Sequence, residues 1–148
     1  MIKPSTRARY ALRAMIELAL HEDSGPVLLR EIAEAQQISP KYLEQLTIPL
    51  RGAGLLQAER GPRGGYELAR PATEITAGEV IEAVEGPLDL LECVRSPAAC
   101  DRSDCCAARG MWSRVSAAMC DVLHQTTLAG LRDKQLAAQR RNVPSYQI

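Results

Sequence analysis

The sequence predicts a mainly α-helical fold with a small β-hairpin, arranged as a winged helix-turn-helix followed by a long dimerisation helix. Two short amphipathic segments are joined by a tight turn, and two strand-like stretches around the glycine-rich turn GPRGG come directly after them. An apolar stripe at heptad-like spacing appears late in the chain. These observations divide the 148 residues into a winged helix-turn-helix at 1–87, a cysteine-rich loop at 88–109 and a dimerisation helix with a C-terminal tail at 110–148.

The N-terminal segment predicts an amphipathic helix that runs to about His21. Ser5 or Thr6 can cap its start. Basic residues precede the apolar stretch, as in a signal peptide, but Arg13 and Glu17 interrupt that stretch and no small-residue cleavage site follows. No apolar run approaches the ~18 residues that a membrane span requires. We therefore expect a cytoplasmic protein with no membrane partner.

Two further helices and a hairpin follow in order. Residues 28–37 form a short amphipathic segment, and Ser39-Pro40 supplies a good N-cap and a proline at the first helical position of the next helix. The stretches 55–60 and 66–69 are strand-like and flank the glycine-rich turn, which predicts a β-hairpin.

The second half begins with a helix that Thr76 can cap and that closes at Gly86. Residues 88–109 show little periodicity and are predicted as a loop. A long helix then carries apolar residues at 3-4-3-4-3 spacing, on Trp112, Val115, Met119, Val122, Thr126 and Ala129. Such a stripe favours a partner helix from a second copy, and packing within the same chain is the alternative.

Charge excludes a globally basic nucleic-acid binder, because 18 basic and 18 acidic residues give a formal net charge of zero. The distribution is uneven, however. Residues 1–70 carry net +2, residues 71–110 net −5 and residues 111–148 net +3. This pattern permits a nucleic-acid face at one end of the molecule.

The helix that begins at Ser39 has the features of a DNA-reading helix. Its N-terminal end presents free backbone N–H groups toward phosphates. Glutamine can pair with adenine, and glutamate can accept from the cytosine amino group, although a carboxylate also repels phosphate and can point elsewhere. At the hairpin tip, arginines among glycines can approach a backbone or enter a minor groove, or can simply be solvated. The candidate DNA-binding residues are Ser39, Lys41, Tyr42, Glu44, Gln45, Arg60 and Arg63.

Four cysteines have the spacing Cys93-x6-Cys100-x4-Cys105-Cys106. The absence of a C-x-x-C pair argues against a thioredoxin-type site. Zinc sites usually combine short cysteine hooks with histidines at fixed spacing, and the two histidines here, His21 and His124, lie far from the cysteines in the sequence. Three spaced thiolates on a loop are suited to an iron–sulfur cluster, and redox-active or incidental thiols are the alternative. Cys120 fits better as a small core residue.

Four stretches resemble the IscR/NsrR/RirA family of bacterial winged-helix regulators: RYALRAM, ISPKYLEQL, RGPRGGYEL and the cysteine loop that ends in Trp112. The resemblance extends from Met1 to about Leu131. It implies a homodimer that crosses through the long helix, a palindromic double-stranded DNA operator and an iron–sulfur cluster held by three cysteines. Counted back from Trp112, it implies Cys93, Cys100 and Cys106 as ligands, with Cys105 extra. It also implies that Tyr42, Glu44, Gln45 and Arg60 face DNA.

Two departures concern the fourth cluster ligand. Arg109 stands where relatives supply a histidine, and Arg9 stands where others supply a carboxylate. The resemblance therefore leaves [2Fe–2S] and [4Fe–4S] both open.

The expected function is DNA-binding transcription regulation, usually repression, controlled by a cluster that senses iron–sulfur or iron status, redox state or nitric oxide. No catalytic constellation, P-loop or dinucleotide fingerprint is present, so no enzyme is expected. One alternative is a cluster-free relative that responds to a small molecule or to thiol oxidation. Another is an iron–sulfur electron carrier or cluster-delivery protein.

Overall fold

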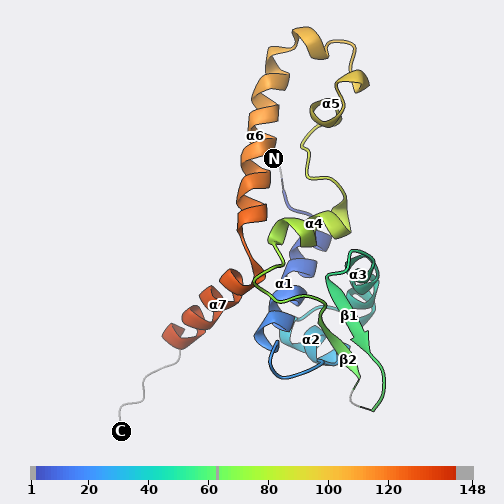
Figure 1. The fold of residues 1–148 in the computed structure, drawn as a ribbon, viewed down its shortest axis with the longest axis vertical. Helices are drawn as coiled ribbons and strands as arrows, with labels where there is room; N and C mark the ends of the chain where they lie inside the picture. Colours follow the sequence, from blue (N-terminus) through green and yellow to red (C-terminus); the bar gives the residue numbers. More distant parts are fainter. Residues whose placement is uncertain (1–2, 63, 143–148) are drawn as a thin grey trace.

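The computed structural model describes residues 3–62 and 64–142. A helical body carries a two-stranded hairpin at one end and a long helix that rises from the other (Figure 1). The elements are α1 (Thr6–Leu20), α2 (Leu29–Gln36), α3 (Pro40–Gly52), β1 (Leu56–Glu59), β2 (Gly65–Leu68), α4 (Ala77–Glu85), α5 (Glu92–Arg95), η1 (Pro97–Ala99), η2 (Ser103–Cys105), α6 (Ala107–Gln125) and α7 (Leu128–Asn142).

Helix α1 lies at the centre of the body, in contact with α2, α3, α4 and α7. The apolar stripes of these helices face one another, as amphipathic helices require. Aliphatic side chains fill the interior, in a chain that has no phenylalanine. The largest fully buried side chains are Met15, Leu43, Leu46, Leu50, Leu55, Ile75, Val80 and Leu128.

Side-chain caps fix where the helices of the body begin, at the positions predicted from the sequence. The Ser5 hydroxyl accepts a hydrogen bond from the backbone N–H of Ala8 at 3.0 Å, and Ser39 begins α3 in the same way. Thr76 and Glu79 form a reciprocal capping box at the start of α4. A cap satisfies backbone N–H groups that the first helical turn leaves free, so the signal is local and readable in the sequence.

The wing, residues 56–68, is the predicted antiparallel hairpin, with Leu56 opposite Leu68. It is tied to the body through Val27, whose N–H donates to the Tyr66 carbonyl at 2.9 Å and whose carbonyl accepts from the Tyr66 N–H at 2.8 Å. A Cβ at Gly65 would lie 2.4 Å from the Val27 carbonyl oxygen. Glycine is therefore required where the wing crosses this segment.

The prediction of one long C-terminal helix is wrong, because the helix is broken between α6 and α7. The Ala77 N–H donates to the Thr126 carbonyl and the Leu128 N–H donates to the Ile75 carbonyl, each at 2.8 Å. These bonds bind the chain at 126–128 to the segment before α4 and turn it out of the helical path. The predicted stripe consequently ends within α6, and Ala129 is buried in the body.

The prediction of a loop over 88–109 is correct only in part. Short helices α5, η1 and η2 lie within it, and residues 107–109 already belong to α6. The last residues of the predicted tail, 143–148, lie outside the described residues. Within the described part of the chain, no helix is long and apolar enough to cross a membrane.

Candidate nucleic-acid interface and cysteine segment

Helix α3 separates its residues into a buried and an exposed side. Leu43, Leu46 and Leu50 are buried in the core. Lys41, Glu44 and Gln45 are exposed, as are Ser39 and Pro40 at the helix start. The predicted reading residues thus lie on the free side of a capped helix, with their side chains available to a ligand.

Tyr42 is half-buried and packs against Tyr10 of α1 in an edge-to-face arrangement, with ring centroids 5.9 Å apart and planes at 82°. The guanidinium groups of Arg9 and Arg13 lie 6.0 Å and 5.6 Å from the centre of the Tyr10 ring. Both distances are within the limit of about 6 Å for cation–π contacts. Basic residues of α1 therefore lie beside the start of α3, a feature that the sequence reading missed because it treated α1 only as a core helix.

A polar network joins α1 to α2. Arg13 Nε donates to the Gln36 side-chain carbonyl at 3.0 Å, and the Gln36 amide nitrogen donates to the Glu17 carboxylate at 2.7 Å. Glu17 and Gln36 are both buried. Buried polar groups that satisfy one another in this way favour a single packing arrangement, here that of α2 against α1.

At the wing, Arg60 is exposed next to the turn. Arg63, the other predicted wing arginine, lies outside the described residues. The wing extends away from the body and ends at its tip well clear of α6 (Figure 1).

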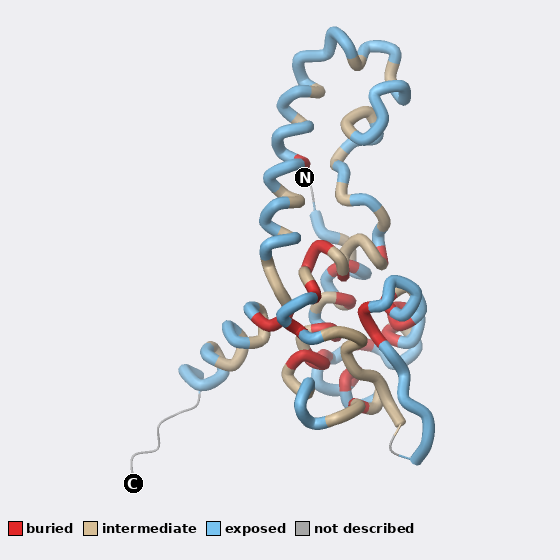
Figure 2. The backbone as a smooth tube through the Cα atoms, in the orientation of Figure 1, coloured by how far each residue is buried: buried red, intermediate tan, exposed pale blue. Residues whose placement is uncertain are grey.

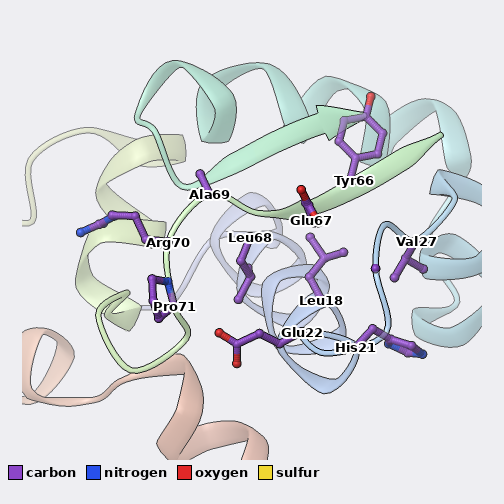
Figure 3. Close-up of a pocket in the computed structure, with 11 residues that line it drawn as sticks. Leu18, His21, Glu22, Val27, Tyr66, Glu67, Leu68, Ala69, Arg70 and Pro71 are labelled. Atoms are coloured by element: carbon purple, nitrogen blue, oxygen red, sulfur yellow. The ribbon is translucent and has the colours of Figure 1, made fainter. Parts of the chain in front are cut away.

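A small cavity of about 230 Å³ lies between the end of α1 and β2 (Figure 3). Its charged side chains are already engaged. Glu22 accepts from the Ala72 N–H at 2.7 Å and from Arg132 at 2.9 Å, and Arg70 pairs with Glu79 at 2.6 Å. Both pairs connect parts of the body, so this cavity is a packing feature of the fold.

Residues 88–106, the cysteine segment, double back alongside α6 (Figure 1). Three contacts fasten the two together. The Leu90 N–H donates to the buried Ser116 hydroxyl at 3.2 Å, and Arg109 Nε donates to the Cys93 carbonyl at 2.8 Å. The Cys120 thiol lies 3.9 Å from the Leu88 carbonyl.

All five cysteines are free thiols. Cys93 and Cys100 are half-buried, and Cys105 and Cys106 are exposed. Burial raises the pKa of the Cys120 thiol, and the nearby carboxylates of Asp89, Glu82 and Asp121 add to the effect. A raised pKa makes Cys120 a poor nucleophile, which supports its assignment as a packing residue.

The structure does not gather the predicted cluster ligands. Among the described residues, no three His, Cys, Asp or Glu side chains lie close enough together to hold a metal ion. Cys93, Cys100 and Cys106 have the right donor chemistry for iron. Arg109 lies at the segment through its contact with the Cys93 carbonyl.

Helix α6 has two apolar sides where the sequence predicted one. Trp112 and Met119 are half-buried and lie four and three residues from Ser116, whose hydroxyl binds the cysteine segment. Met111, Val115 and Val122 recur at helical spacing on the outer side and are exposed. They form, with Ala118, the outer apolar stripe of α6.

His124 connects α6 to the body. Its ring lies against Gly78 of α4, where a Cβ would come within 2.8 Å of the ring. The ring nitrogen Nδ1 lies 3.0 Å from the Cys120 carbonyl oxygen, and Nε2 lies 3.4 Å from a Glu82 carboxylate oxygen. The Cys120 carbonyl, as a hydrogen-bond acceptor, raises the pKa of His124, and Glu82 raises it further against an opposing effect of burial.

Comparisons with known proteins agree on one family. The sequence model of the Rrf2 family, described as "Iron-dependent Transcriptional regulator", matches residues 4–134. The HTH-type transcriptional regulator IscR of Serratia proteamaculans is 40% identical over 141 residues, which are 93% of this chain and 85% of the relative.

Solved structures give the same result. CymR of B. subtilis, described as the global cysteine regulator, superposes with a TM-score of 0.77 at 41% identity, covering 90% of this chain and 98% of CymR. IscR of T. potens superposes with a TM-score of 0.77 at 37% identity, covering 93% and 91%. Together with the mainly helical winged fold and the exposed face of α3, these similarities show that the chain belongs to the Rrf2 family of transcriptional regulators.

Proposed function

We propose that this regulator binds a palindromic DNA operator as a homodimer, usually as a repressor, and that its cysteine segment controls the binding. The observation that carries the proposal is the exposed polar side of α3, which begins at a serine cap and lies beside the basic residues of α1. A helix of this kind can enter the major groove with its N-terminal residues at the base edges.

Each candidate residue has a distinct role in this proposal. Gln45 pairs with adenine and Glu44 accepts from a cytosine amino group. Lys41 and the positive end of the α3 dipole bind phosphate. Tyr42, held against Tyr10, positions the helix start, and Arg60 reaches the adjacent minor groove from the wing.

The outer apolar stripe of α6 supports the homodimer. A helix with exposed apolar side chains at helical spacing gains stability when a second helix covers it. The two-fold symmetry of a homodimer matches that of a palindromic operator.

Contacts of the cysteine segment with α6 support the regulatory part of the proposal. The segment is fastened to α6 at Ser116 and at Arg109, and α6 is connected to the body through His124. A chemical change at the cysteines that alters these contacts would change how two DNA-binding bodies are spaced in the dimer.

Two kinds of chemical change have separate support. An iron–sulfur cluster on Cys93, Cys100 and Cys106 is supported by the thiolate donors and by the similarity to IscR. Thiol oxidation is supported by the exposed free thiols of Cys105 and Cys106 and by the similarity to CymR of Staphylococcus aureus, which has been solved in an oxidized form.

The DNA-binding part is tested by selecting duplexes from a random library with the purified full chain. We expect enrichment of a palindrome. Arg60→Ala should lower the slope of log affinity against log salt by about 0.9, because one positive charge that neutralises the adjacent phosphates is lost from the minor groove. Arg140→Ala, an exposed arginine near the end of α7, is the matched control and should bind as the wild type does. Failure to enrich any sequence would contradict the proposal.

The regulatory part is tested by anaerobic purification followed by iron, sulfide and visible absorption measurements. If a cluster is the sensor, Cys93→Ala, Cys100→Ala and Cys106→Ala each lose it, whereas Cys105→Ala and the control Cys120→Ala retain it. A colourless wild type whose DNA binding changes with an oxidant would instead establish thiol oxidation. If DNA binding does not change with cluster content, with oxidant or with any of the cysteine substitutions, the cysteine segment does not regulate it.

A further inference from the structure

Ile48 is the most exposed large apolar side chain of the described residues, with 69% of its surface in solvent. It lies on α3. The other exposed large apolar side chains among the described residues lie in the arm: Met111, Val115 and Val122 on α6, and Leu91 just before α5. Isoleucine is a poor choice for a solvent-facing helix position, both for its apolar surface and for its β-branched side chain.

The position of Ile48 on the helix is the second observation. Residues 41, 44, 45 and 48 are all exposed, and the pairs 41/44, 41/45, 44/48 and 45/48 are three or four residues apart along α3. Residues four apart on a helix lie on the same side, about 6 Å apart along the axis. Ile48 therefore continues the proposed DNA-reading face by one turn beyond Glu44.

The surroundings of Ile48 favour DNA over a protein partner. A shallow groove between the end of α3 and β1 is lined by Ile48, Arg51 and Gln57 among others. Arg51, exposed and one turn further on, can donate to a phosphate. A single apolar side chain among Lys41, Glu44 and Arg51 is too small and too charged in its surroundings for a stable protein interface.

Major-groove chemistry identifies the group that an isoleucine would contact. The C5-methyl of thymine is the apolar group that a base pair presents in the major groove, and apolar side chains read it. With base pairs stacked about 3.4 Å apart, a residue one helical turn beyond Glu44 reaches about two base pairs further.

We propose that Ile48 is a specificity-determining residue that contacts a thymine C5-methyl about two base pairs from the base that Glu44 reads. The proposal rests on the DNA-binding function proposed above. It adds an apolar residue to the polar residues Glu44 and Gln45 that are proposed to read bases. The wild-type chain prefers thymine at that position because uracil and cytosine lack the methyl group that covers the Ile48 side chain.

The test replaces each thymine of the selected duplex by deoxyuridine, one at a time, which removes only the methyl group. One replacement should weaken wild-type binding about fourfold, the effect expected for one buried methyl group. Ile48→Ala should bind the unmodified duplex more weakly and should be indifferent to that same replacement. Ile48→Val, which retains a branched side chain, should keep most of the response.

Thermal unfolding of the variants provides the folding control, since a residue this exposed contributes little to stability. If Ile48→Ala responds to every deoxyuridine as the wild type does, Ile48 does not read the methyl group, although the DNA-binding function stands. If the library yields no enriched duplex, the DNA-binding function itself is overturned, and this proposal with it.

Discussion

Two regions of this chain are built in contrasting ways. The body, residues 5–85 together with the start of α7, contains every buried apolar side chain among the residues that the structure describes. The arm, residues 86–125, contains one buried residue, and it is a polar one, Ser116. In Figure 2 nearly all the red stretches of the tube lie in the body, among tan and pale blue ones, whereas the arm is mostly pale blue.

The contrast shows that the two regions obtain their stability from different sources. Burial of apolar surface stabilises the body, because its four N-terminal helices and the wing enclose a common core. The arm is held by hydrogen bonds between the cysteine segment and α6 and by the contact of His124 with α4. Its outer apolar stripe is left for a second copy in the proposed dimer, and its weak internal packing suits the regulatory role proposed for the cysteine segment.

The largest expected effect is on the free energy of unfolding, when a leucine is replaced by alanine in each region. Leu50→Ala removes a side chain that is 1% exposed and should lower the free energy of unfolding by about 3 kcal/mol, since it leaves a cavity. Leu91→Ala in the arm, at 40% exposure, should cost less than about 1 kcal/mol. Urea denaturation of both variants measures the difference, and equal costs would show that the arm has a core of its own.

The second effect concerns the outer apolar stripe of α6. Val122→Asp places a carboxylate on this stripe and should weaken dimerisation by about tenfold or more, because covering the charge requires its desolvation. Ile48→Asp is the control, at nearly the same exposure on a different face. Sedimentation velocity over a range of concentrations measures both, and a dimer unaffected by Val122→Asp would place the interface elsewhere.

A smaller effect is expected where the cysteine segment meets α6. Ser116→Ala removes the acceptor of the Leu90 N–H and should cost about 1 kcal/mol. Hydrogen exchange should increase over 88–106 and stay unchanged in α1 to α4. Ser113→Ala, at an exposed position of the same helix, should change neither. Uniform loss of protection across the chain would mean that body and arm unfold as one unit.

The smallest effect is a pH dependence at the joint between the regions. The pKa of His124 is raised above 6.5 in the folded chain, so the protonated ring stabilises the folded state. This contribution is fully present below the unfolded pKa and is lost as the pH rises through the folded value. Stability should therefore fall above about pH 6.5 by more in the wild type than in His124→Gln.

Gly78→Ala should reproduce the His124→Gln result, because a Cβ at Gly78 displaces the ring from its two partners. Thermal unfolding between pH 5.5 and 8.5 compares the three proteins, at pH values chosen about the usual histidine range. Identical pH profiles for all three would remove His124 from the joint.

Local signals in the sequence determined most of the body. The caps at Ser5, Ser39 and Thr76 begin helices as predicted, and the glycine-rich turn joins the predicted strands. Each of these features depends on residues within a few positions of one another, which is why the sequence alone predicts them. The exposed side of α3 was predictable for the same reason, since helical spacing sorts buried from exposed positions.

Tertiary structure alone decided the features that depend on residues far apart in the chain. The break between α6 and α7 results from backbone hydrogen bonds of residues 126–128 to residues 75–77, and no helix-breaking residue marks it. The Tyr10–Tyr42 contact and the placement of His124 on Gly78 likewise join separate elements. The cysteine spacing indicated suitable donors, but whether they meet depends on how the segment folds against α6. Such contacts are absent from a local pattern because they form only when packing brings the elements together.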